Sequence, residues 1–138
     1  MYNFQYHRPQ SLDDALALLA DSDDGKLVAG GMTLLPTMKQ RLAQPEDLID
    51  LGAVPGLTGI SAADGQVVIG AMTRHAEVEA SDVVRVQIPA LAELAGMIGD
   101  PQVRNRGTIG GSVANSDPAA DYPAAVLACA ASVVTNSR

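Results

Sequence analysis

The sequence predicts an α+β fold built from two consecutive mixed units, and three observations support this prediction. Apolar stretches with the spacing of short strands and helices alternate over the first fifty residues. A turn signal at Pro55-Gly56 is followed by a hairpin signal at Asp64-Gly65. Helical apolar spacing returns after Pro89, a residue that favours the first turn of a helix. Since 47% of the residues are hydrophobic and 3% are aromatic, the core must be aliphatic.

The first unit, residues 1–54, is expected to run β-α-β-α-β. Ser11 opens a near capping box before apolar residues at helical spacing, and Gly30-Gly31 ends a very short strand. Thr33 is a suitable N-cap for a second helix. In chain order we expect a strand over 3–7, a helix over 12–20, a strand over 26–29, a helix from Thr33 through Arg41 and a strand over 48–51.

The second unit, residues 55–138, is expected to begin with a hairpin and to continue with helices. The segment 99–122 shows no clean period and is rich in Gly, Pro, Asn and Asp, so we expect a long functional connection there. The expected elements are strands over 58–61 and 67–71, a helix over 74–80 capped by Thr73, a helix from Pro89, a helix opened by Pro123 and a strand beginning at 132–135. Because the sequence stops as that strand begins, we expect this unit to be incomplete at its C-terminus.

Composition excludes several classes of protein. The net charge of −7 argues against nucleic-acid binding, which depends on basic patches. One cysteine rules out a disulfide framework and an iron–sulfur cluster held by this chain, and two histidines leave little for a zinc site. The longest nearly apolar run, 124–134, is too short for a membrane span, which needs about 20 residues, and no secretory signal is visible. We therefore expect a soluble cytoplasmic chain with neither a metal site nor a convincing acid–base constellation.

Two glycine pairs are the strongest candidates for a binding site. Glycine permits positive φ, so that successive N–H groups can point inward and bind an anion. Gly30-Gly31 lies between a predicted strand and a predicted helix, and Gly110-Gly111 lies inside the long connection. Neither pair belongs to a P-loop or a Rossmann fingerprint. From these residues alone, a plain turn and a phosphate site both remain open at each pair.

The strings around these pairs are more specific. LVAGGMTLLPTMKQRL (Leu27–Leu42) and GTIGGSVANSDPAADYPA (Gly107–Ala124) resemble the two flavin-binding motifs of the molybdenum hydroxylase family. They are most similar to the medium, FAD-binding subunit of enzymes of the aerobic carbon monoxide dehydrogenase and xanthine dehydrogenase type. FQYHRPQSLDDALALL near the start, VVIGAMTRHAEVE at Val67–Glu79 and DPQVRNRGTIGG at Asp100–Gly111 support the resemblance over essentially the whole chain.

The resemblance implies the two-subdomain FAD-binding fold of the vanillyl-alcohol oxidase (PCMH) type, here truncated. FAD would lie between subdomains 1–54 and 55–138, with backbone donors from the first motif on its pyrophosphate and hydroxyl and amide donors from the second motif opposite. Asp121 would accept a hydrogen bond from a cofactor hydroxyl, and Lys26 would approach the adenosine end. The implied cofactor-binding residues are Ala29, Gly30, Gly31, Met32, Thr33, Leu34, Val103, Gly107, Thr108, Ile109, Gly110, Gly111, Ser112, Asn115 and Asp121.

The implied function is electron transfer. FAD would carry electrons from an iron–sulfur subunit, fed by a molybdenum-cofactor subunit, to a terminal acceptor, so the chain would belong to an oxidoreductase and supply no catalytic residue of its own. It would be cytoplasmic, or held at the inner face of the membrane through partners. Two alternatives remain: a stand-alone flavin oxidase of the same fold, and a flavin-free scaffold that docks an iron–sulfur subunit.

Five further side chains have expected roles of their own. Gly110 to Ala114 approximates a hydrolase nucleophile elbow, but both histidines precede Ser112, so the triad order cannot be completed. Cys129, among alanines, is expected to be a buried small hydrophobe. Arg104 and Arg106 contact phosphate or a neighbouring subunit, or form a solvated pair. His75, at a helix start, is expected to have a structural role.

Overall fold

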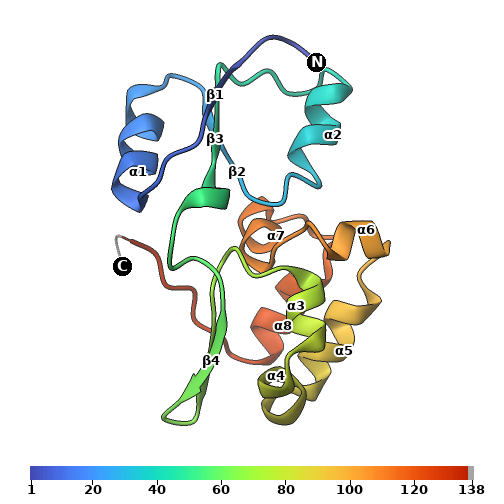
Figure 1. Cartoon of the computed structure of the whole chain (residues 1–138). Coiled ribbons are helices and arrows are strands. Elements are labelled where there is room, and N and C mark those ends of the chain that lie inside the picture. Colours follow the sequence, from blue (N-terminus) through green and yellow to red (C-terminus); the bar gives the residue numbers. More distant parts are fainter. Residues whose placement is uncertain (137–138) are drawn as a thin grey trace.

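The structure, a computed structural model, describes residues 1–136 and contains a small sheet unit above a larger helical unit (Figure 1). The sheet unit, residues 5–50, has three parallel strands in the order β1-β3-β2. Parallel strands that follow one another in the chain need a crossover connection, and here a helix provides it: α1 between β1 and β2, and α2 between β2 and β3. The elements are β1 Gln5–His7, α1 Leu12–Asp21, β2 Gly25–Val28, α2 Leu34–Lys39 and β3 Asp47–Asp50.

The middle strand β3 carries the buried centre of this unit. Leu48 and Ile49 are buried, and successive strand residues face opposite sides of a sheet. Leu48 packs in a cluster with Val28 and with Met38 of α2. Figure 1 shows α1 and α2 on opposite sides of the strands. The predicted β-α-β-α-β order is therefore confirmed, with shifts of one or two residues at most element ends.

A short 3-10 turn, η1 Leu51–Ala53, leads out of β3 toward the hairpin. The antiparallel strands β4 Ile60–Ala63 and β5 Gln66–Ile69 pair around Asp64-Gly65. Both turn residues have positive φ, 52° and 74°, as the tight two-residue hairpin turn requires. The hairpin prediction is confirmed. Both strands lie closer to the turn than expected, since β4 begins two residues later and β5 ends two residues earlier than predicted.

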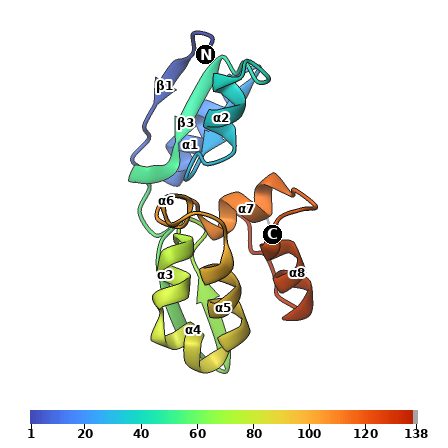
Figure 2. The same cartoon turned by 90° about the vertical axis from the view of Figure 1, so that its right-hand side faces the viewer.

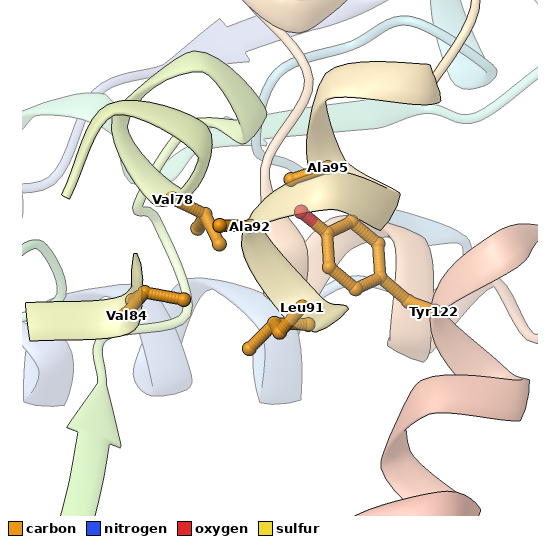
Figure 3. Packing of buried hydrophobic residues seen from close by; sticks show 6 residues of the cluster. All are labelled: Val78, Val84, Leu91, Ala92, Ala95 and Tyr122. Atoms are coloured by element: carbon orange, nitrogen blue, oxygen red, sulfur yellow. The ribbon is translucent and has the colours of Figure 1, made fainter. Parts of the chain in front are cut away.

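Six helices make up the rest of the helical unit, residues 60–128. They are α3 His75–Ala80, α4 Asp82–Gln87, α5 Pro89–Met97, α6 Pro101–Arg104, α7 Ile109–Asn115 and α8 Asp121–Ala128. Their core, shown in Figure 3, consists of Val78, Val84, Leu91, Ala92, Ala95 and Tyr122. Tyr122 reaches from α8 toward α5 and is the largest fully buried side chain. The core is otherwise aliphatic, as the composition predicts.

The expectation of an irregular connection over 99–122 is wrong. Asp100 accepts a hydrogen bond from the Gln102 amide and starts α6, and the Thr108 hydroxyl accepts one from the Gly111 amide and starts α7. Helices of four and seven residues are too short to display an apolar period, and α7 contains two glycines. Local capping, rather than amphipathic spacing, therefore marks both helices.

Two threonine caps predicted from the sequence are also wrong. Thr33 precedes α2 but makes no side-chain cap hydrogen bond. The helix over 75–80 is capped at Arg74 rather than at Thr73. The buried Thr73 hydroxyl instead donates to the Gly59 carbonyl oxygen and accepts from the Gly59 N–H, so it fastens the start of the hairpin.

The end of the chain differs from expectation in two respects. No strand forms over 132–135, because the described residues provide no partner strand for it; Ser137 and Arg138 lie outside the described residues. Cys129 is exposed rather than buried, since α8 packs only part of its surface against α5 and α7. Throughout residues 1–136, no helix has the length and apolar character that crossing a bilayer requires.

Candidate functional site

A cleft of about 600 Å³ lies where the sheet unit meets the helical unit, and both glycine motifs line it. Figure 2 shows α7 at the junction, with the sheet unit above it and α8 beside it. This volume is within the range of small-molecule sites in proteins. The predicted site residues that the structure brings to this cleft are Ala29, Gly30, Gly31, Met32, Thr33, Leu34, Val103, Gly107, Thr108, Gly110, Gly111, Ser112, Asn115 and Asp121.

Ile109 is the exception among the predicted residues. It packs against the helical core cluster rather than lining the cleft. Further residues line the cleft without belonging to the predicted set of cofactor-binding residues, among them Leu51, Ala71, Met72, His75, Ile98 and Asp117. Ala71 and Met72 lie in the string VVIGAMTRHAEVE, whose resemblance to the family was the available signal for them.

The two motifs touch through their backbones. A Cβ added at Gly30 would overlap the carbonyl oxygen of Arg106, and it would lie 2.7 Å from the Cα of Gly107. A Cβ at Gly111 would lie 3.4 Å from that of Ala29, in ordinary van der Waals contact. Glycine at position 30 therefore allows the two walls to approach at a distance that no side chain tolerates.

The first motif presents unpaired backbone donors. Gly31 has a φ of 73°, the left-handed conformation that favours glycine, and its carbonyl accepts a hydrogen bond from the Leu35 amide at 3.1 Å. The backbone N–H groups of 31–34 have no acceptor among residues 1–136. Backbone donors lining a cleft need a partner, and an anion satisfies several of them at once.

The backbone N–H groups of 109–111 in the second motif already donate hydrogen bonds within the chain. The Ile109 amide donates to the Thr73 carbonyl at 3.0 Å, and the Gly110 amide donates to the Ala71 carbonyl at 2.9 Å. The Gly111 amide donates to the Thr108 hydroxyl at 3.1 Å. The side chains that this wall offers as hydrogen-bond donors include those of Ser112 and Asn115.

Few charged side chains line the cleft. Lys26 contributes one cation, and it pairs with the Asp24 carboxylate at 2.8 Å. Asp117 and Asp121 contribute two anions, and the Asp117 carboxylate accepts a hydrogen bond from the Ala119 amide at 2.9 Å. A bound anion would therefore be held mainly by neutral donors, while carboxylates suit hydroxyl groups of the same ligand.

Arg104 is not free to bind a ligand. Its guanidinium pairs with Glu79 at 3.4 Å and donates to the carbonyl oxygens of Ile98 and Gly99 at 3.1 and 3.0 Å. Arg104 is therefore not half of a solvated pair, one of the alternatives expected for it: it joins α6 to the end of α5 and to Glu79 of α3. The Arg106 carbonyl, rather than its side chain, meets the first motif.

His75, which lines the cleft, forms a buried polar pair with Tyr122 behind it in the helical core. Their ring centroids lie 5.2 Å apart, and the His75 Nδ1 and the Tyr122 hydroxyl have no hydrogen-bond partner among the described residues. Burial lowers the pKa of His75, although the Asp121 carboxylate opposes this shift. Burial and the same carboxylate raise the pKa of Tyr122, so its hydroxyl stays protonated. Both rings are neutral near pH 7.

No cluster of three His, Cys, Asp or Glu side chains able to hold a metal ion occurs within residues 1–136. The unpaired amides of 31–34 suit an anionic ligand, and the carboxylates of Asp117 and Asp121 suit hydroxyl groups on the same ligand.

Comparison with known proteins gives concordant results. Residues 2–138 match the family described as the FAD binding domain in molybdopterin dehydrogenase. The chain is 51% identical to the carbon monoxide dehydrogenase medium chain of Hydrogenophaga pseudoflava over 95% of its own length and 46% of that chain. It is 35% identical to the xanthine dehydrogenase FAD-binding subunit of Escherichia coli O157:H7, over 88% of its own length and 42% of that subunit.

A solved structure is equally similar. The carbon monoxide dehydrogenase of Hydrogenophaga pseudoflava that lacks the Mo-pyranopterin moiety of the molybdenum cofactor matches with a TM-score of 0.90 and 52% identity. The match covers 92% of this chain and 45% of that one. The chain therefore spans about half the length of the curated relatives it matches.

Proposed function

The chain belongs to the family of FAD binding domains of molybdopterin dehydrogenases, and from that premise we propose that its cleft holds the pyrophosphate and adjoining hydroxyl groups of FAD. The predicted family, the α+β fold and FAD as the cofactor of the domain are confirmed. The single observation that supports the placement of FAD is that residues 31–34 line the cleft with backbone N–H groups that have no acceptor among the described residues.

The residues present fit this cofactor. A pyrophosphate offers several anionic oxygens to the backbone donors of 31–34. Because residue 31 is glycine, no side chain of its own stands in the way of a ligand at its N–H group. Ser112 and Asn115 add side-chain donors from the opposite wall, and Asp121 accepts from a hydroxyl. Asp117 and Asp121 would repel the phosphates, so the hydroxyl-bearing parts of FAD lie on their side of the cleft.

FAD, when bound, supplies the redox chemistry, and this chain supplies binding and orientation. The first motif holds the phosphates, while the contact between Gly30 and the Arg106 backbone fixes the spacing of the two walls. Val103 and Gly107, which lie at or just before the start of the second motif and line the cleft, pack near the flavin ring in this proposal. Residues 1–54 and 55–138 then form the two FAD-binding subdomains.

The role in the complete protein is electron transfer. In this proposal the chain is the N-terminal part of the flavoprotein subunit of a molybdenum-containing dehydrogenase. Electrons arrive from the iron–sulfur clusters of one partner subunit, which receives them from a molybdenum-cofactor subunit, and leave FAD for a terminal acceptor. The similarity to the medium chain and FAD-binding subunit of two dehydrogenases supports this assignment.

Titration of the purified chain with FAD, with FMN as the matched control, tests the proposal. FMN lacks the pyrophosphate and adenosine, so the proposal expects FAD to bind at least about tenfold more tightly, a difference of about 1.4 kcal/mol. Flavin fluorescence and calorimetric heat report binding, and circular dichroism reports folding. A folded chain that binds neither flavin would favour the flavin-free scaffold, and equal binding of both would contradict the placement of the pyrophosphate.

A further inference from the structure

His75 lies at the junction of three elements. It is the first residue of α3, it is 5% exposed, and it lines the cleft. Its ring stands between the Tyr122 ring of α8 and the backbone of Gly107. An apolar side chain would fill this position without leaving Nδ1 unpaired, and an unpaired buried polar atom costs stability. The imidazole therefore lowers the stability of the fold relative to an apolar side chain of the same shape.

The ring lies directly against Gly107. A Cβ added at Gly107 would lie 2.5 Å from Nε2 and 2.9 Å from Cδ2 of His75, and 3.0 Å from the Val103 carbonyl oxygen. The ring thus occupies the space in which a side chain at 107 would stand. The φ of Gly107 is not in the left-handed region, so glycine is required here by the neighbouring ring rather than by the backbone conformation.

The same contact ends a short antiparallel junction between 71–75 and 107–110. The His75 amide donates to the Gly107 carbonyl at 3.0 Å, and Arg74 and Thr108 form a bridge. The Ile109 and Gly110 amides continue the junction with the Thr73 and Ala71 carbonyls. The start of the second motif, 107–110, is therefore fastened to 71–75, and the His75 ring is packed at the end of this junction.

Gly107 also abuts the first motif, because a Cβ at Gly30 would lie 2.7 Å from the Gly107 Cα. We propose that His75 is a positioning residue for the flavin site: its ring sets the Gly107 backbone and thereby the distance between the two walls of the cleft. This inference rests on the proposed function, since the ligand that senses the distance is FAD.

The charge state of the ring agrees with this role. Desolvation favours the neutral imidazole, and the Tyr122 hydroxyl beside it is neutral as well, so Asp121 of α8 is the charged group acting on the ring. A neutral ring packs against a backbone CH₂ without a requirement for a counter-ion.

A double-mutant cycle tests the inference on the full 138-residue chain. FAD affinity is measured by flavin fluorescence for the wild type, His75→Ala, Gly107→Ala and the double variant, with circular dichroism and thermal unfolding as checks on folding. We expect each single variant to weaken FAD binding about tenfold or more, and the double variant to bind within about threefold of His75→Ala, because the alanine at 75 makes room for the methyl group at 107. His75→Ser repeats the cycle if His75→Ala does not fold.

Gly110→Ala is the matched control. A Cβ at Gly110 would meet Ala71, at 2.5 Å from its Cβ, and not His75. His75→Ala must therefore fail to rescue Gly110→Ala. Equal rescue of both glycine variants would show general loosening and overturn the inference, and so would a double variant whose loss of affinity equals the product of the two single losses, or a folded His75→Ala variant with unchanged affinity. A folded wild-type chain that binds no FAD would instead overturn the proposed function, and the inference with it.

Discussion

The two glycine motifs look alike in sequence and differ in how their backbone donors are used. The N–H groups of 31–34 have no acceptor within the described residues, whereas the N–H groups of 109–111 are bonded to 71–73 and to the Thr108 hydroxyl. The first motif follows a strand and is free on its cleft side. The second motif lies against another segment of the chain. A glycine pair is therefore not a phosphate site by composition alone, because the neighbouring backbone decides whether its donors remain available.

The comparison also explains why both motifs line one cleft. The first motif provides donors, and the second provides a wall held at a fixed distance by the contact of Gly30 with the Arg106 carbonyl. In our account, the free energy of FAD binding comes mainly from the first motif, and the geometry comes from the second. Substitutions in and beside the two motifs, and the pH dependence of stability, test this account.

Gly30→Ala is expected to have the largest effect. The added methyl group overlaps the backbone of Arg106, which cannot rotate away, so the two walls must separate. Overpacking of this kind costs about 1–3 kcal/mol of stability, and we expect FAD binding to fall below detection in the titration.

Gly96→Ala is its control, since a Cβ at Gly96 in α5 meets only the flexible end of Glu79. Gly96 lies in the last turn of α5, where alanine is a better helix former than glycine, so this variant should be about as stable as the wild type, with unchanged FAD affinity. Normal FAD binding by Gly30→Ala would contradict the contact between the motifs.

The threonines that precede α2 and α7 form a matched pair. The Thr108 hydroxyl caps α7, while Thr33 makes no cap hydrogen bond. Thr108→Ala should lower the free energy of unfolding by about 1 kcal/mol, and Thr33→Ala by less than about 0.5 kcal/mol. Denaturant unfolding of both variants measures the difference; equal losses would refute the assignment of the cap.

The smallest expected effect is a pH dependence of stability. Burial lowers the pKa of His75 in the folded state below its ordinary value of 6.5, so the unfolded chain binds more protons in that range. Stability is therefore lost as the pH falls below about 6.5 toward the folded pKa. His75→Gln should remove this part of the slope. The difference between the two unfolding curves from pH 7.5 to 5 measures it, and parallel curves would exclude the contribution of His75.

Much of the sheet unit follows from local patterns. The β-α-β-α-β order was predictable because strands and helices alternate with clear capping and turn residues, such as Ser11 and Gly30. The helices α6 and α7 were not predictable, since they are too short to show the 3.6-residue spacing of apolar side chains that marks an amphipathic helix. The exposure of Cys129 could not be read from its apolar neighbours, because burial depends on which elements pack against α8.

The same distinction applies to the site. The strings around both glycine pairs predicted which residues would line a cleft, and the structure brings all of them there except Ile109. The state of their N–H groups was not predictable, because it depends on the contact of 107–111 with 71–75, a long-range pairing that no local pattern contains. The proximity of His75 to Gly107 was missed for the same reason.

Amide hydrogen exchange, measured residue by residue with and without FAD, tests the central claim most directly. The account predicts that the amides of 31–34 exchange rapidly in the free chain and become protected when FAD is added. It predicts that the amides of 109–111 are protected in both states, because their hydrogen bonds exist without the cofactor. Protection that appears on FAD addition at 109–111 and not at 31–34 would contradict the account.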